Sequence, residues 1–173
     1  EVDGYIANLD LFEKYGIPLP TNYAEFADVC SRFEELGING YVNDYDEDYS
    51  CMEALQGCAI PELMSMEGML WRMGYESETP ENPVGLDDQV WPQVFERFQQ
   101  YLQDTWTEPA DAEMDYDPMA PDFFAGKTAM IRGTATDCVM FRQNEGVNCA
   151  MLPYFGETSE DSWLLTYPHC QVA

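Results

Sequence analysis

The sequence TAMIRGTATDCVMFRQNEGVNCAML, residues 128–152, predicts the alternation of strand and helix that decides the fold. Thr128 to Arg132 is a short apolar run of the kind that forms a buried strand. Gly133 predicts a sharp turn, and a helix is expected from Thr134 to Arg142. Val147 to Leu152 predicts the next strand. Helices that alternate with short buried strands are typical of a layered α/β architecture.

The rest of the chain extends this pattern. Asn22 is a plausible N-cap, and Glu25 three residues later completes a capping box for a helix that Gly37 ends. A helix over residues 50–74 is expected to break at Pro61, and its second half is apolar on all sides, which predicts burial. The other predicted elements are an extended segment at 4–9, a helical turn at 11–15, a second helix at 88–103, and strands at 38–42 and 163–167. The helix after Gly133 is capped by Thr134 or Thr136.

Charge excludes two classes of partner. The chain has 33 Asp and Glu against 7 Lys and Arg, which gives a net charge of -26. Nucleic acids and anionic membranes bind clustered Lys and Arg, and the basic residues here are scattered. No stretch approaches the roughly 18 apolar residues of a membrane span, so no direct membrane insertion is expected. The chain opens Glu1-Val2-Asp3 without the features of a signal peptide, and both ends are expected to be cut from a longer protein.

The residues that carry chemistry form no recognisable catalytic or metal site. The six cysteines contain no C-x-x-C pair, so buried thiols are favoured, with at least one disulfide left open. His169 is the only histidine, and there is no nucleophile elbow or phosphate-binding loop. The sequence therefore predicts no enzyme, cofactor or metal. The acid excess leaves open an alternative, a free-standing acidic interaction module, and two acidic clusters, 44–48 and 111–117, leave calcium binding by such a module open.

The order of several motifs resembles a known family. Asn8 to Pro18 (NLDLFEKYGIP), followed by Pro20 to Phe26 (PTNYAEF), resembles the opening of the second lobe in extracellular solute-binding proteins of ABC transporters. The closest branch is the carbohydrate-binding, maltose-binding-protein-like one. Phe124 to Met130 (FAGKTAM) resembles the family's "F-x-x-G-K-A-A-M", and Val147 to Pro153 resembles its "[VI]-G-V-x-P-[LF]-P". The resemblance covers nearly the whole chain.

This resemblance implies a fold, a function and a location. The fold would be one lobe of a type II periplasmic-binding-protein fold, a small sheet flanked by helices. Residues 1–173 would form a single lobe, the second of two, with the first lobe and the C-terminal helices outside this sequence. The solute, a sugar or oligosaccharide, would lie in the cleft between lobes and pass to an ABC-transporter permease. The protein would be extracellular and tethered through a lipoprotein anchor outside this segment, or periplasmic.

The resemblance also places the ligand-binding residues. They are expected in an acidic loop and in the segment after the central strand: Asp46, Glu47, Asp48, Tyr49, Arg132, Gly133, Thr134, Ala135 and Thr136. The family's sugar-stacking Trp falls at Ala135, so an aromatic replacement from Tyr45 or Tyr49 is expected. Trp71 and Trp91 lie on apolar helical stripes and are interpreted as core residues.

Overall fold

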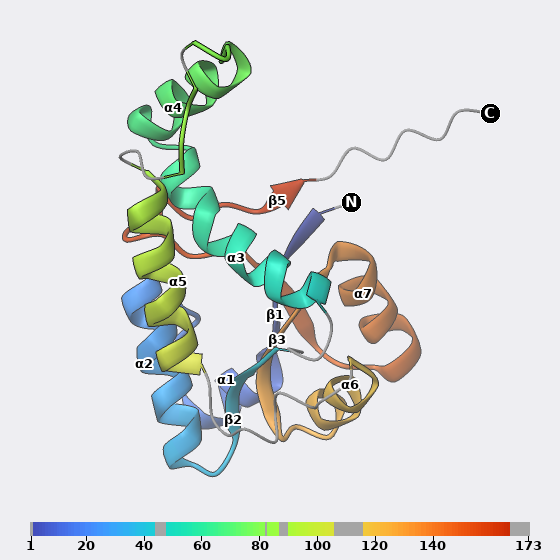
Figure 1. Ribbon diagram of the computed structural model, residues 1–173. Coiled ribbons are helices and arrows are strands. Elements are labelled where there is room, and N and C mark those ends of the chain that lie inside the picture. The colour runs from blue at the N-terminus through green and yellow to red at the C-terminus, as the bar shows by residue number, and fades with distance from the viewer. Residues whose placement is uncertain (1, 44–47, 82, 87–89, 106–115, 167–173) are drawn as a thin grey trace, which may run out of the picture.

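The structure of the chain is a computed structural model that describes residues 2–43, 48–81, 83–86, 90–105 and 116–166. A small mixed sheet lies at the centre, with helices on both faces (Figure 1). The strands are β1 (Val2–Asn8), β2 (Asn39–Val42), β3 (Thr128–Thr134), β4 (Cys149–Leu152) and β5 (Leu165–Thr166). The helices are α1 (Leu9–Tyr15), α2 (Tyr23–Glu35), α3 (Asp48–Leu63), α4 (Met66–Glu76), α5 (Trp91–Thr105), α6 (Tyr116–Phe124), α7 (Ala135–Met140) and a π-helical turn, η2 (Phe141–Glu145). The α/β class expected from the sequence is confirmed.

The strand order is β2-β3-β1-β4, with β5 paired to β1. β1 runs antiparallel to β3, β4 and β5, whereas β2 is parallel to β3. β2 and β3 therefore end at the edge of the sheet where β1 begins. This edge is the one to which the resemblance assigned the ligand.

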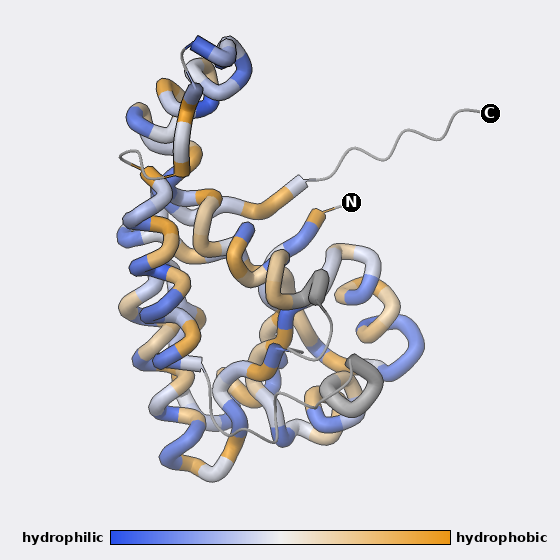
Figure 2. Tube along the Cα trace, in the orientation of Figure 1, coloured by the Kyte–Doolittle hydropathy of each residue, from blue (hydrophilic) through white to orange (hydrophobic). Residues whose placement is uncertain are grey.

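The sheet separates two apolar clusters because successive side chains of a strand point to opposite faces. Tyr5 and Ala7 of β1 belong to the larger cluster, with residues from α1, α2, α3 and α5. Ile6 points to the other face and packs with Phe123 of α6 and Cys138 of α7. Of the helices that cover the first face, α2 and α5 are amphipathic, and α5 alternates between hydrophobic and hydrophilic residues along its length (Figure 2).

The predicted start and end of α2 are confirmed. The Asn22 side chain accepts a hydrogen bond from the backbone N–H of Glu25 at 3.0 Å. The Glu25 carboxylate reaches back to the N–H and hydroxyl of Thr21, both at 2.8 Å, one residue earlier than in a standard capping box. Gly37 follows the helix with a φ of 74°, in the left-handed region that glycine tolerates.

Gly133 is not the predicted turn. It lies inside β3, opposite Gly4 of β1. A Cβ atom at Gly133 would lie 2.7 Å from the Cδ1 of Ile6, so the glycine serves close packing rather than a change of direction. The chain turns one residue later, where Thr134 caps α7 and forms a capping box with Asp137. Thr134, not Thr136, is therefore the cap.

The predicted break at Pro61 is also wrong. α3 continues through Pro61 to Leu63, and the break lies at Ser65. Ser65 caps α4 by accepting a hydrogen bond from the N–H of Gly68 at 3.0 Å, and its hydroxyl donates to the carbonyl of Glu62 at 2.6 Å. The buried Pro61 removes only one backbone donor, and the helix ends two residues later, so little helical structure is lost.

The expected burial of the second half of this region is not observed. Met66, Leu70 and Met73 of α4 are each more than 60% exposed. Figure 1 shows α4 projecting from the body of the structure beyond the end of α3. Trp71 and Trp91 are only half-buried, so both lie at the margin of the core rather than inside it.

The remaining differences are at element ends. β4 begins at Cys149 rather than Val147, and the final strand is limited to Leu165–Thr166, with Trp163 forming an isolated bridge to Tyr154. Buried thiols are confirmed for Cys30, Cys58, Cys138 and Cys149, whereas Cys51 is exposed. Among the helices that the structure describes, none has the length and apolar character needed to cross a membrane.

Candidate functional site

The segment predicted to edge the ligand site, 132–136, joins β3 to α7. Arg132 and Gly133 are buried in the last part of the strand. Thr134 and Ala135 are half-buried, and Thr136 is exposed in the first turn of α7. The structure therefore places these residues together at the edge of the sheet where β3 ends and β1 begins.

Arg132 is the centre of a buried charged cluster. Its Nη1 lies 3.4 Å from Oδ2 of Asp3 in β1 and 2.6 Å from Oε2 of Glu53 in α3. The hydroxyl of Tyr154 donates to the same Asp3 oxygen at 3.0 Å. Asp3 and Arg132 are 1% and 8% exposed, so the ion pair is shielded from solvent. Four separate segments of the chain are joined by these contacts.

The electrostatics of this cluster follow from its burial. Burial raises the pKa of Asp3, and the nearby Arg132 opposes that rise. Burial disfavours the charged form of Arg132, but the carboxylates of Asp3 and Glu53 outweigh it, so the pKa of the guanidinium is raised. Burial and the neighbouring Asp3 raise the pKa of Tyr154. Arg132 stays a cation, and Tyr154 stays a neutral donor.

Several buried polar atoms at this edge have no hydrogen-bond partner among the residues that the structure describes. They are Nδ2 and Oδ1 of Asn43, Oδ1 of Asp3 and Nε of Arg132. Asn43 is 3% exposed and directly follows β2. Because Val42 pairs with Ile131 in a parallel register, Asn43 comes next to Arg132. Buried polar groups are nearly always hydrogen-bonded, so these atoms are expected to find partners outside the described residues.

The other predicted segment, Asp46 to Tyr49, is described only in part. Asp46 and Glu47 lie outside the described residues, and the structure places Asp48 and Tyr49 in the first turn of α3 without describing their side chains. Glu53, about one helical turn after Tyr49, contacts Arg132. The N-terminal half of α3 thus lies against the end of β3.

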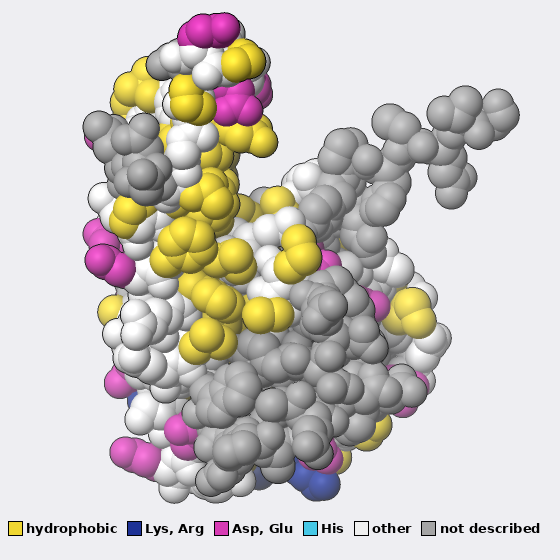
Figure 3. Space-filling view, viewed as in Figure 1, with side chains coloured by type: hydrophobic (Ala, Val, Ile, Leu, Met, Phe, Trp, Pro, Cys, Tyr) yellow, Lys and Arg dark blue, Asp and Glu magenta, His cyan; other side chains and the backbone are white. Residues whose placement is uncertain are grey.

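An apolar groove of about 440 Å³ lies along α3, and one of its lining residues, Leu165, pairs with Asp3 in the sheet. Its lining comes from α3, from the start of α5 and from β5: Met52, Leu55, Gln56, Ala59, Ile60, Leu63, Trp91 and Leu165. Figure 3 shows hydrophobic side chains gathered over α3 and α4 on this face of the molecule. The indole of Trp91 packs edge-on against Trp71, with ring centroids 5.5 Å apart, and its buried Nε1 has no hydrogen-bond partner in the described ranges.

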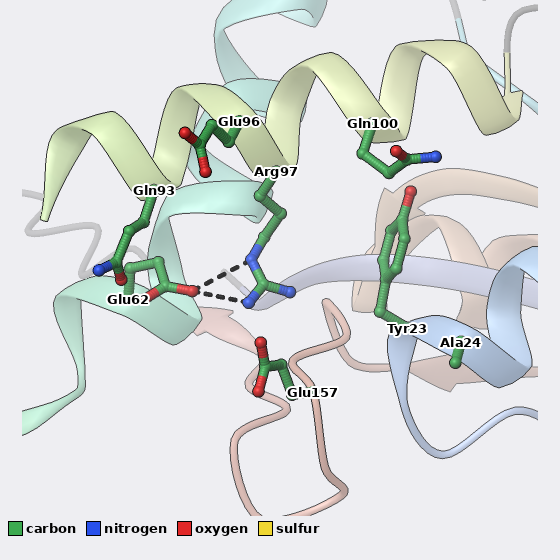
Figure 4. A pocket seen from close by; sticks show the side chains of 8 residues that line it. All are labelled: Tyr23, Ala24, Glu62, Gln93, Glu96, Arg97, Gln100 and Glu157. Atoms are coloured by element: carbon green, nitrogen blue, oxygen red, sulfur yellow. Dashed lines mark hydrogen bonds and ion pairs between the residues drawn. The ribbon is translucent and has the colours of Figure 1, made fainter.

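A separate polar pocket of about 460 Å³ lies between α2, α5 and the segment that follows β4. Figure 4 shows the Arg97 guanidinium engaged by Glu62, with Nη2 and Nε 2.6 and 3.2 Å from the same carboxylate oxygen. Tyr23, Glu96 and Glu157 also line it. This ion pair fastens the end of α3 to α5. None of the predicted ligand-binding residues lines this pocket.

The structure gives no support to a metal centre in the residues it describes, where no group of three His, Cys, Asp or Glu side chains is arranged to hold an ion. The two acidic clusters considered for calcium, 44–48 and 111–117, fall in segments whose side chains lie outside that description. The calcium interpretation therefore stays a prediction.

Sequence reasoning found Arg132 but missed the residues that surround it. They are Asp3, Asn43, Glu53 and Tyr154, which come from four different segments. The sheet register brings Asp3 and Asn43 to Arg132, and the packing of α3 and of the segment after β4 adds the other two. One signal was available for Asp3. It alternates with Tyr5 and Ala7, so it shares their buried face, and a charged residue in phase with core positions is unusual.

Comparison with known structures identifies the fold. No family model matches the sequence, and no curated protein matches it. The family 1 extracellular solute-binding protein from Bifidobacterium longum subsp. infantis superimposes with a TM-score of 0.70 at 15% identity, over 94% of this chain and 41% of that one. The apo-form of RafE from Streptococcus pneumoniae gives a TM-score of 0.73 at 14% identity over the same shares. The Bacillus licheniformis sugar transporter in complex with stachyose gives 0.68 at 13%, again over 94% and 41%.

The chain therefore has the fold of one part of an extracellular solute-binding protein of this kind. It spans about two fifths of the length of these structures. The fold predicted from the order of motifs is confirmed at an identity too low for the comparison to carry a ligand.

Proposed function

We propose that this chain, which has the fold of one part of an ABC-transporter solute-binding protein, binds a carbohydrate at the edge where β2 and β3 end. The observation that carries the proposal is the set of buried polar atoms on Asp3, Asn43 and Arg132 for which the described part of the chain offers no hydrogen-bond partner. Sugar hydroxyls both donate and accept hydrogen bonds, so a polyol can satisfy all of these atoms at once. The groups predicted from the resemblance, Asp46 to Tyr49 and Arg132 to Thr136, would flank the same ligand.

The apolar groove beside this edge suits the non-polar faces of sugar rings. Trp91 supplies an aromatic surface with an unpaired N–H, and Met52 and Leu55 supply flexible apolar contacts. A groove of about 440 Å³ is within the usual size of a small-molecule site, so it accommodates more than one sugar unit. RafE was solved in complex with raffinose and the Bacillus licheniformis protein with stachyose, which agrees with an oligosaccharide ligand.

In this proposal the chain is the second lobe of a longer, non-enzymatic protein that delivers its solute to a permease. The exposed apolar residues of α4 support a covering segment, since soluble proteins rarely leave such a surface open. The covering segment would be the C-terminal helices that the resemblance implies. An extracellular or periplasmic location, with a lipid anchor elsewhere in the protein, belongs to the same proposal.

The test is calorimetric titration of raffinose, stachyose and β-linked oligosaccharides into the longer protein that contains this chain. Asn43→Ala is compared with Asn148→Ala, because Asn148 is an exposed Asn near the opposite end of β4. Loss of two buried hydrogen bonds to the ligand weakens binding by about 1–3 kcal/mol, or roughly 5- to 150-fold in Kd. Asn148→Ala should leave Kd unchanged. Equal affinities for wild type and Asn43→Ala would refute the placement of the ligand, and no heat with any sugar would refute the carbohydrate class.

The isolated 173-residue chain should bind the same sugar weakly or not at all, because the other lobe supplies half of the contacts. A micromolar or tighter Kd for this chain alone would contradict a shared, two-lobed site.

A further inference from the structure

Two buried thiols meet on the face of the sheet that α6 and α7 cover. Sγ of Cys138, in α7, lies 3.6 Å from Sγ of Cys149, the first residue of β4. Cys138 and Cys149 are 6% and 1% exposed. The Cys149 sulfur is also 3.6 Å from the carbonyl oxygen of Cys138. Both side chains pack in the cluster formed with Ile6, Ile131 and Phe141.

We propose that Cys138 and Cys149 form a disulfide when the protein folds in an oxidising compartment. A disulfide needs its sulfur atoms about 2.05 Å apart, so the two thiols have to approach by roughly 1.5 Å. The bond would tie α7 to β4 and close the segment from Cys138 to Cys149, which includes the π-helical turn Phe141–Glu145. It would strengthen the element that follows Thr134 at the proposed ligand edge.

The oxidant for this step is a small disulfide such as oxidised glutathione. The thiolate of one cysteine attacks a sulfur of the small disulfide and releases one small thiolate, which leaves a mixed disulfide on the protein. The thiolate of the second cysteine then attacks the protein sulfur and releases the other small thiolate. The two protons lost by Cys138 and Cys149 end on the two released thiols, and the small disulfide is reduced as the protein is oxidised.

The burial of the two thiols determines at which stage of folding the thiol–disulfide exchange takes place. Burial and the hydrogen bond with Cys138 raise the pKa of Cys149 to about 12, so little thiolate exists in the folded protein near neutral pH. Of the five cysteines that the structure describes, the exposed Cys51 is therefore the one whose thiol reacts fastest in the folded state. The bond between Cys138 and Cys149 forms during folding, before the apolar cluster closes, and the closed cluster then protects it from reduction.

The oxidising compartment in this inference rests on the extracellular location proposed above, whereas the pairing itself rests on the geometry alone. The disulfide pairing is tested separately from the proposed function, with glutathione in solution and without any ligand. A protein that forms this disulfide but binds no sugar overturns only the proposed function.

The experiment refolds the chain from urea in a buffer of reduced and oxidised glutathione, blocks the remaining thiols with iodoacetamide in denaturant, where buried thiols are accessible, and maps the peptides. Cleavage after Arg132, Arg142, Glu145 and Glu157 releases residues 133–142, which contain only Cys138, and residues 146–157, which contain only Cys149. The expected product is these two peptides joined, with a mass two hydrogens below their sum. Cys51→Ser should give the same product, because Cys51 takes no part in the pair.

The oxidised protein should also melt about 5–10 °C above the reduced protein, as expected for closing a loop of this size in a chain of this length. Cys138→Ser should abolish the difference in Tm between oxidising and reducing buffer. Recovery of both peptides as separate alkylated species after refolding overturns the inference, as does a bond from Cys138 to any other cysteine. The wild-type digest decides the matter even where Cys138→Ser fails to fold.

Discussion

Replacing Arg132 by Met tests whether the buried charged cluster holds the edge of the sheet together. The substitution preserves an unbranched side chain and removes the cation that lies 3.4 Å from Asp3 and 2.6 Å from Glu53. Removing one partner of a buried ion pair costs about 3–5 kcal/mol, because the other charge stays buried without compensation. For a chain of this length, that loss corresponds to a fall in Tm of roughly 6–20 °C.

The pH dependence of this loss identifies its cause. Burial already raises the pKa of Asp3, and Arg132 is the main group that lowers it, so the Arg132→Met variant raises that pKa further. A carboxyl group whose pKa is raised in the folded state stabilises the fold when protonated, and this stabilisation is lost as pH rises through the raised pKa. The deficit of the variant relative to wild type should therefore be smaller at pH 5 than at pH 8. Thermal unfolding followed by circular dichroism at both pH values measures it.

Lys127→Met is the matched control. Lys127 forms an ion pair with Asp122 at 2.9 Å, but the two side chains are 67% and 34% exposed. An exposed pair of this kind contributes less than about 1 kcal/mol. If Arg132→Met and Lys127→Met lower Tm equally, or if the deficit of Arg132→Met is the same at both pH values, the cluster does not stabilise the fold in the way argued.

Three further predictions concern local structure, and each is measured by urea unfolding. Thr134→Ala should cost about 1 kcal/mol through loss of the capping box, and Thr136→Ala less than about 0.5 kcal/mol, so equal losses would contradict the assignment of the cap. Gly40→Ala places a Cβ 2.3 Å from the Cα of Cys30 and should lower the free energy of unfolding by more than about 2 kcal/mol. Gly16→Ala meets no atom within 4 Å but has a φ of 63°, so it should cost about 1 kcal/mol. A larger loss for Gly16→Ala than for Gly40→Ala would contradict the close packing of α2 on β2. Burial raises the pKa of Cys58 from 9.0 to about 12, so the stability of the reduced protein should fall as pH rises from about 9 toward 12, and Cys58→Ala should flatten that slope.

The sequence predicted best the features that depend on a few neighbouring residues. The cap at Asn22 and the helix end at Gly37 follow from local hydrogen bonds and backbone conformation, and both are confirmed. Gly133 shows the limit of such reasoning. A glycine permits a turn and also permits close packing. At Gly133 the close packing against Gly4 and Ile6 determines the structure, and these two residues are distant in the sequence.

The candidate site depended even more on distant residues. Arg132 was found because its motif resembles a family pattern, but the groups that engage it come from β1, α3 and the segment after β4. Periodicity describes which face of a strand a residue occupies and not which strand lies beside it. Asn43 and Arg132 could be placed together only after the parallel register of β2 and β3 was known.

The exposed apolar side of α4 connects the wrong prediction of burial with the proposed function. A helix apolar on most sides is stable in water only when another layer covers it. Burying Met66, Leu70 or Met73 would contribute about 1.5–3 kcal/mol each, a gain that the described residues leave unrealised. Solved proteins of the same fold are more than twice as long as this chain. The composition of α4 is therefore that of a helix covered by another layer of structure. The prediction that α4 is buried was wrong for this chain because its described residues do not supply that layer.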